Sequence, residues 1–72
     1  MMSERWVTLY VFVVLVETPQ ALRVVFTNGD EGWVPKSQIN EKSEVHTLAD
    51  EGTLIVPAWL ADKLVPRHWE RF

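Results

Sequence analysis

The sequence lacks cysteine, and it has only three glycines and seven lysines and arginines among its 72 residues. Without cysteine the chain can form no disulfide and offers no thiolate ligand to zinc. Its histidines, His46 and His68, lie far apart and have no carboxylates at ligand spacing, so we expect neither a structural metal nor a cofactor. Small folds without such staples often depend on oligomerisation, which four tryptophans also favour.

Ten acidic residues outnumber the basic ones, giving a net charge of −3 and a pI of about 5.2. This balance argues against broad, non-specific DNA binding, which depends on clustered Lys and Arg, although it leaves room for a local basic patch. The acidic pairs Asp30-Glu31 and Asp50-Glu51 fall in expected turns and are interpreted as solvated charge. There is no Gly-rich phosphate loop and no recognisable nucleophile setting, so we expect a protein that is not an enzyme.

The run from Trp6 to Val16 carries no charge and is rich in β-branched and aromatic residues, as is typical of a strand. At a period of two, both of its faces are apolar. One face carries Val7, Leu9, Val11, Val13 and Leu15, and the other carries Trp6, Thr8, Tyr10, Phe12, Val14 and Val16. Both faces therefore need covering, which favours a rolled small barrel, a partner chain, or both.

The same run is too short for a membrane-spanning helix, which needs about 20 residues. No small-residue cleavage site follows Val16, so a signal peptide is not indicated. We expect no membrane contact and a location in the cytoplasm of a host cell.

Turn signals at Thr18-Pro19-Gln20 and Asn28-Gly29 divide the chain into further short strands. The expected strands are Trp6 to Glu17, Ala21 to Thr27, Glu31 to Val34, Glu44 to Leu48 and Thr53 to Val56. A helix is expected from Pro57 to about Leu64, because Pro66 limits its extension.

Together these elements predict one mainly β domain over residues 1–72. The expected architecture is a small five-stranded antiparallel barrel, SH3-like or OB-like, with one short C-terminal helix. A bent antiparallel sheet capped by the helix is the alternative. Residues 1–5 and 67–72 are expected to be flexible or docked on a partner.

Two segments could form a binding site. In the first, Trp33 precedes a proline turn that carries Lys36, Ser37 and Gln38. A flat ring beside a cation, a hydroxyl and an amide can stack on a base, a peptide or an aromatic ligand. The alternative is that Trp33 plugs the end of a barrel.

The second segment is the expected helix, on which Trp59 and Lys63 lie one turn apart. If the stripe formed by Pro57, Leu60, Ala61 and Leu64 faces the core, Trp59 is exposed and available to a partner. If the buried arc is shifted to include Trp59, Lys63 extends past it to solvent.

The long first strand supplies the expected contact between subunits. We expect Tyr10, Phe12, Val14 and Val16 to line a homo-oligomer interface. His46 is interpreted as a surface residue. Arg67, His68 and Arg71 form a weak basic patch in the tail, interrupted by Glu70.

Three segments, Glu17 to Val24, Trp33 to Ile39 and Gly52 to Lys63, resemble a small domain of uncharacterised bacteriophage and prophage proteins. Its members show an aromatic-Ile/Val-Pro-Lys-Ser-Gln motif and a later Trp-Leu-Ala helix. The resemblance implies a genomic setting near phage replication and recombination. Gly32-Trp33-Val34-Pro35 is also locally similar to a segment of SH3 domains, which favours the fold more than peptide binding.

The leading hypothesis is a non-enzymatic, oligomeric, phage-type accessory domain. It would bind a component of DNA metabolism, either single-stranded nucleic acid or a host or phage protein. The alternative is a phage counter-defence inhibitor or sponge that occupies a host defence protein or a signalling nucleotide, for which an acidic balance suits mimicry of nucleic acid.

Overall fold

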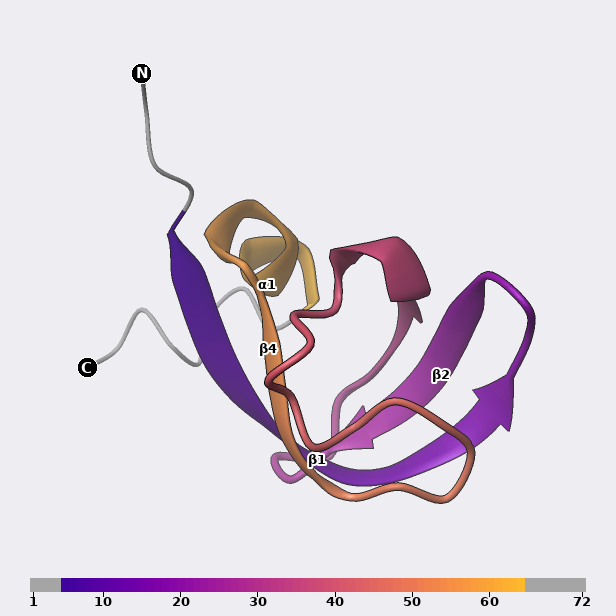
Figure 1. Cartoon of the computed structure of the whole chain (residues 1–72). Helices are drawn as coiled ribbons and strands as arrows, with labels where there is room; N and C mark the ends of the chain where they lie inside the picture. Colours follow the sequence, from indigo (N-terminus) through magenta and orange to yellow (C-terminus); the bar gives the residue numbers. More distant parts are fainter. Residues whose placement is uncertain (1–4, 65–72) are drawn as a thin grey trace.

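The computed structural model describes residues 5–64 and places them in a curved sheet with one helix (Figure 1). All strand pairs are antiparallel, in the order β3-β2-β1-β4. The elements are β1 (Trp6–Glu17), β2 (Ala21–Phe26), β3 (Glu31–Pro35), a 3-10 helix η1 (Lys36–Gln38), β4 (Gly52–Pro57) and α1 (Ala58–Leu64).

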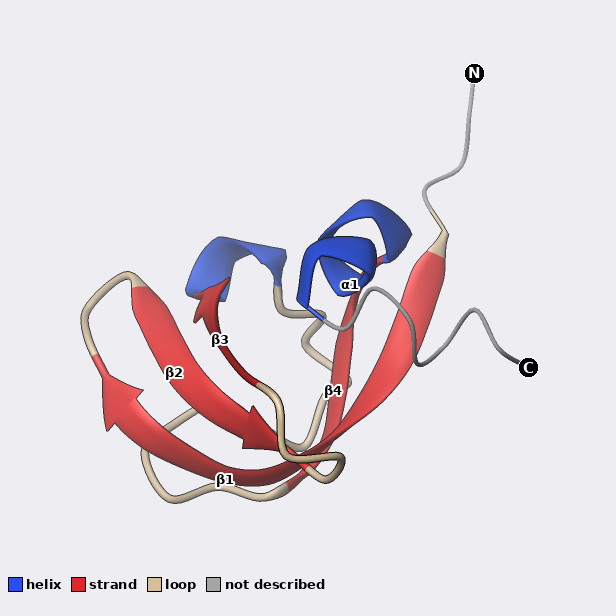
Figure 2. Cartoon of the chain, turned by 180° about the vertical axis from the view of Figure 1, so that it is seen from behind, coloured by secondary structure: helices blue, strands red, loops and turns tan. Residues whose placement is uncertain are grey.

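The central strand β1 serves two partners in succession. Its first half, Trp6 to Val11, pairs with β4, and its second half, Val11 to Glu17, pairs with β2. The register with β2 shifts twice, between Val11 and Val13 and again between Val14 and Val16. Such bulges bend a strand and increase its twist. Accordingly, β1 is strongly curved, and α1 and η1 lie on its concave side (Figures 1 and 2).

The two predicted turns form with the chemistry that their residues supply. The Thr18 hydroxyl accepts a hydrogen bond from the Ala21 N–H at 2.9 Å, and this closes the connection between β1 and β2. At the next hairpin Gly29 takes φ +96°, which a residue with a side chain rarely adopts. The Asn28 side chain accepts from the Asp30 N–H at 3.0 Å. These local bonds hold β2 beside both of its neighbours.

The core lies on the concave side, hereafter the inner face. It is built from alternate residues of all four strands, from Val45 of the connecting loop, and from Leu60 and Ala61 of α1. Leu64 reaches β3, where an added Cβ on Gly32 would stand 2.9 Å from the Leu64 Cδ2 atom. The helix therefore buries its Leu60-Ala61-Leu64 side and leaves Trp59 exposed, which confirms the first of the two packings expected for it.

The edge of β4 that faces away from β1 is covered by the loop between η1 and β4. The Asn40 N–H donates to the Ile55 carbonyl at 2.8 Å, and the Glu44 N–H donates to the Thr53 carbonyl at 3.0 Å. In return, the Ile55 N–H donates to the buried Ser43 hydroxyl at 2.8 Å. This loop replaces a strand at that edge.

The predicted strand from Glu44 to Leu48 is therefore wrong. The N–H groups of Glu44 and Val45 both donate to the Thr53 carbonyl, so the regular ladder is lost after one position. The next two N–H groups, those of His46 and Thr47, turn to the Asp50 carboxylate at 2.9 Å each. A side-chain acceptor that captures consecutive backbone donors favours a turn over a strand.

The five-stranded closed barrel expected from the sequence is not what forms. The sheet has four strands and stays open, with α1 across its concave side (Figure 2). This is the alternative architecture, a bent antiparallel sheet capped by a helix. The other boundaries agree to within a residue or two, and the expectations for residues 1–4 and 65–72 lie outside the described part of the chain.

Val14 corrects the expected interface, because it is only 2% exposed and lies in the chain's own core. Strict alternation would place it on the same face as Phe12. The first bulge adds one residue between Val11 and Val14. The next side chain to point inward after Val11 is therefore Val14 and not Val13. A side chain buried in this way is unavailable to another subunit.

The effect of the bulges on burial can be tested with two identical substitutions. Val14→Ala should lower the free energy of unfolding by about 2 kcal/mol, because it removes buried methyl groups and leaves a cavity. Val16→Ala is the matched control; Val16 is 40% exposed, and its loss should cost less than about 0.5 kcal/mol. Urea unfolding of both variants measures the difference. An equal loss of unfolding free energy in the two variants would contradict the claim that the bulge turns Val14 into the core.

Candidate functional site

The convex side of the sheet, hereafter the outer face, carries an uncovered apolar surface. Cross-strand pairing puts Val16, Arg23 and Trp33 in one row across β1, β2 and β3, and puts Val13 and Val25 in the next. Further along β1, Tyr10 and Phe12 are exposed aromatic residues. We define the outer patch as Tyr10, Phe12, Val13, Val16, Val25 and Trp33.

The aromatic members of this patch are the most exposed. Phe12 is 65% exposed, Tyr10 is 59% exposed and Trp33 is 46% exposed. If each aromatic side chain presents about 150–250 Å², these three leave on the order of 300–400 Å² uncovered. A contiguous apolar area of about 300–600 Å² is the largest that a typical monomer shows, and it often marks an interaction site. Summed over one face, the exposed aromatic area is comparable to such a patch, and the outer patch is therefore the strongest candidate for a binding surface.

Trp33 belongs to this patch and is not the plug of a barrel end. Its ring stands beside the guanidinium of Arg23, whose carbon lies 5.8 Å from the ring centroid. Arg23 also donates to the Glu31 carboxylate at 2.8 Å. The cation beside Trp33 is thus already balanced by an acid. This ion pair lies within the outer face, with Arg23 between Trp33 and Val16 and with Glu31 beside Val25.

The structure does not gather the predicted partners of Trp33 around its ring. The Lys36 ammonium pairs with the Glu17 carboxylate at 2.6 Å. Ser37 is exposed and Gln38 is half-buried, and both lie in η1. The structure therefore gives no cluster in which Trp33, Lys36 and Gln38 act together, and the sequence motif from Trp33 to Gln38 is divided between a strand edge and a structural turn.

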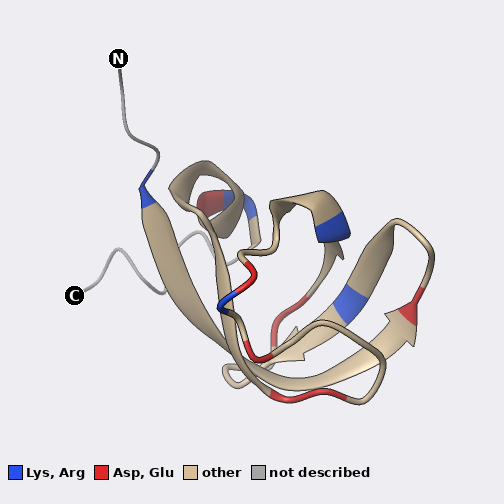
Figure 3. Cartoon of the chain, in the orientation of Figure 1, with Lys and Arg blue, Asp and Glu red and all other residues tan. Residues whose placement is uncertain are grey.

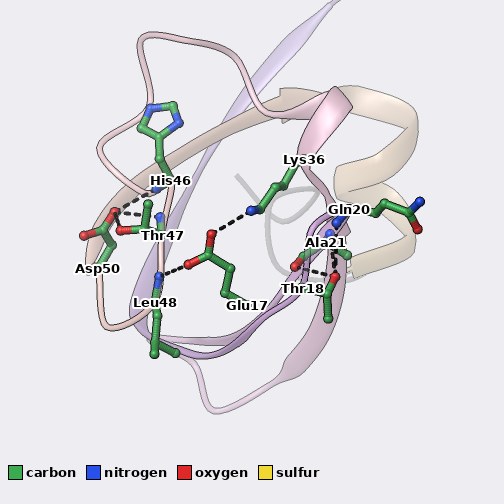
Figure 4. A network of polar contacts seen from close by, with 9 residues as sticks. All are labelled: Glu17, Thr18, Gln20, Ala21, Lys36, His46, Thr47, Leu48 and Asp50. Atoms are coloured by element: carbon green, nitrogen blue, oxygen red, sulfur yellow. Dashed lines mark hydrogen bonds and ion pairs between the residues drawn. The ribbon is translucent and has the colours of Figure 1, made fainter.

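Glu17 is the centre of the polar network shown in Figure 4. One carboxylate oxygen accepts from Lys36, and the other accepts from the Leu48 N–H at 3.0 Å. The hydrogen bond from Lys36, followed by that from the Leu48 N–H, holds the pKa of Glu17 below its ordinary value. One side chain at the end of β1 therefore fixes both η1 and the loop that follows it.

Asp50 organises the same loop from within. Its carboxylate accepts from the N–H groups of His46 and Thr47, and these bonds lower the pKa of Asp50 (Figure 4). The backbone beside it also reaches β1, because the Val14 N–H donates to the Asp50 carbonyl at 3.0 Å. Asp50 was expected to be a solvated turn charge. The sequence signal for this role is the spacing: Asp50 follows Thr47 by three residues and His46 by four, so its carboxylate can accept from both backbone N–H groups.

A second exposed aromatic lies on α1. Trp59 is half exposed, and the Lys63 ammonium stands 5.8 Å from the centroid of its ring. Such a pair contributes modestly at an exposed site. Because α1 covers the concave side of the sheet, Trp59 and Lys63 are not joined to the outer patch, and the two expected contact areas remain separate.

Between residues 5 and 64 no group of three or more His, Cys, Asp or Glu side chains could hold a metal ion. Within the same range, no helix has the length and apolar character needed to cross a bilayer.

Comparison with known proteins gave no match to a family model, a curated protein or a solved structure. The resemblance to phage domains consequently rests on the sequence motifs alone.

The role of Glu17 predicts a specific dependence of stability on pH. The pKa of Glu17 is lowered in the folded state. Its contribution to folding stability is therefore present above the unfolded-state pKa, near 4.5, and is lost as the pH falls through the lower folded-state pKa. Glu17→Gln should lower the urea midpoint at neutral pH and flatten the loss of stability between about pH 5 and 3. Glu41→Gln, at an exposed loop position, is the control and should keep both the midpoint and the acid limb of the wild type.

Proposed function

We propose that this chain is a non-catalytic protein-binding domain whose contact surface is the outer patch. The observation that carries the proposal is the exposure of Tyr10, Phe12 and Trp33 on one face of a sheet whose opposite face already holds the core. Enrichment of aromatic residues and depletion of charge distinguish the centre of protein interfaces from ordinary surface. Arg23 and Glu31, which lie within this face, are paired with each other and so bring no net charge to it.

The charges of the chain favour a protein over a nucleic acid as partner. Residues 5–64 hold five basic and eight acidic side chains. Of the basic ones, Arg23 and Lys36 are paired with carboxylates, and Lys63 stands over Trp59. Among the residues coloured in Figure 3, which are those the structure describes, the basic positions are scattered among acidic ones and form no stripe that could follow a phosphate backbone.

The biological setting of this binding domain is proposed from its motifs. Their resemblance to phage domains supports a phage-type accessory protein of DNA metabolism that acts in a host cytoplasm. Exposure of Tyr10, Phe12 and Val16 supports their part in a protein contact, whether with a second copy or with another protein. Occupation of a host defence protein is the second candidate, and the net charge of −3 would suit its approach to a basic site.

Photo-crosslinking in the native cell tests the contact surface directly. A benzophenone amino acid placed at Phe12 should give covalent adducts with protein, whereas the same group at Leu48 should give few. Leu48 is a matched control because it is a 54% exposed hydrophobic residue on the loop rather than on the outer patch. Addition of Tyr10→Lys should remove the Phe12 adducts, because it places a charge in the apolar contact. Equal adducts from both positions, or none from Phe12, would refute the proposal.

Nucleic-acid binding can be excluded or established separately. Labelled single-stranded and duplex DNA, titrated at low salt with micromolar protein, should show no binding, because acidic side chains outnumber basic ones and two of the five described basic side chains are already ion-paired. Binding that weakens steeply as salt rises would require a nucleic-acid partner and would overturn the preference for protein.

A further inference from the structure

The outer edge of β3 carries backbone groups that no other described segment pairs. Along the β2–β3 ladder, the Phe26 N–H donates to the Asp30 carbonyl, and the Lys36 N–H donates to the Gln20 carbonyl. Paired positions alternate in an antiparallel ladder, and the β2–β3 register shows no shift. Gly32 and Val34 therefore bond to β2, whereas the N–H and carbonyl groups of Glu31 and Trp33 and the carbonyl of Pro35 point away from the sheet.

The two edges of the sheet are treated differently. The outer edge of β4 is closed by hydrogen bonds from the loop at Asn40 and Glu44. At β3, Leu64 of α1 packs against Gly32 from the inner face, and no described segment bonds to the outward row of backbone groups. An open row of this kind is a template for another strand.

We propose that the β3 strand of a second copy of this chain pairs with β3, antiparallel and about a two-fold axis at Trp33. Trp33 of each chain then exchanges two backbone hydrogen bonds with its symmetry mate. The N–H of Glu31 donates to the carbonyl of Pro35 in the other chain. Four intermolecular hydrogen bonds result, and Pro35, which has no N–H, is used only as an acceptor.

The donor pattern and the side chains favour a second copy in this register. Trp33 lies directly opposite its equivalent on the outer face, and such aromatic cross-strand pairs are stabilising. The two Glu31 carboxylates lie at opposite ends of the pairing, each still bonded to its own Arg23. If Glu31 of one chain were instead paired with Trp33 of the other, the two Glu31 carboxylates would be diagonal neighbours, where like charges repel.

This pairing adds to the proposed binding function without depending on it. A two-fold axis perpendicular to the sheet keeps both outer faces on the same side. The two outer patches then lie on one shared face and meet through Trp33, as the sheet extends from four to eight strands.

Two substitutions at Glu31 test the backbone pairing. Both Glu31→Pro and Glu31→Ala remove the carboxylate, but only proline removes the outward N–H and places a ring at the edge, where proline is tolerated in a strand. By light scattering at high micromolar concentration, the wild type and Glu31→Ala should have twice the 8.4 kDa chain mass. Glu31→Pro should raise the dissociation constant by about tenfold or more, since two of the four hydrogen bonds are lost.

Hydrogen exchange on the wild type keeps the test independent of whether Glu31→Pro folds. In the dimer, the amides of Glu31 and Trp33 should exchange about tenfold or more slowly than in dilute monomer, while Val34 should change little because it already bonds within the chain. A monomeric wild type, or concentration-independent exchange at Glu31 and Trp33, would overturn the inference. So would a dimer that Phe12→Lys dissociates and a folded Glu31→Pro does not, although the outer patch would then stand as the contact surface.

Discussion

A single long strand, β1, determines how much of this molecule can be buried. It pairs with β4 along its first half and with β2 along its second half, so the sheet must turn around it. The two bulges supply the bend, and the first of them directs Val14 to the concave side that Leu9 and Val11 already face. With α1 and the 40–51 loop both used on that side, the described chain has nothing left to cover the convex one. The exposed aromatics follow from this division.

Polar side chains maintain the curved shape. The Glu17 carboxylate connects the end of β1 to η1 and to the loop, and Asp50 holds the loop in a turn whose backbone reaches Val14. Their lowered pKa values are explained by hydrogen bonds that shape the fold. Ionisable groups with shifted pKa values often mark active sites, but structural networks shift them as well, and here the geometry favours the structural explanation.

Much of the fold could be predicted from the sequence, because local chemistry decides it. The Thr18-Pro19-Gln20 and Asn28-Gly29 turns, the long first strand and the short helix depend on neighbouring residues. The bulges depend on how β1 fits two partners at once, so simple alternation placed Val14 on the wrong face. The loop from Glu44 to Leu48 has a strand-like composition, yet Asp50 captures its donors. The candidate site shows the same limit. Trp33 could be identified from its local motif, but its neighbour Arg23 could be found only from the register between β2 and β3.

The central claim is that the isolated chain leaves its outer face open to water. Hydroxyl-radical labelling of dilute protein, read residue by residue by mass spectrometry, tests it most directly. Phe12 and Tyr10 should be oxidised rapidly, whereas Phe26, which is 3% exposed in the core, should be protected. If Phe12 is as protected as Phe26 in a chain shown to be monomeric, the outer face is covered from within and the proposed binding surface does not exist.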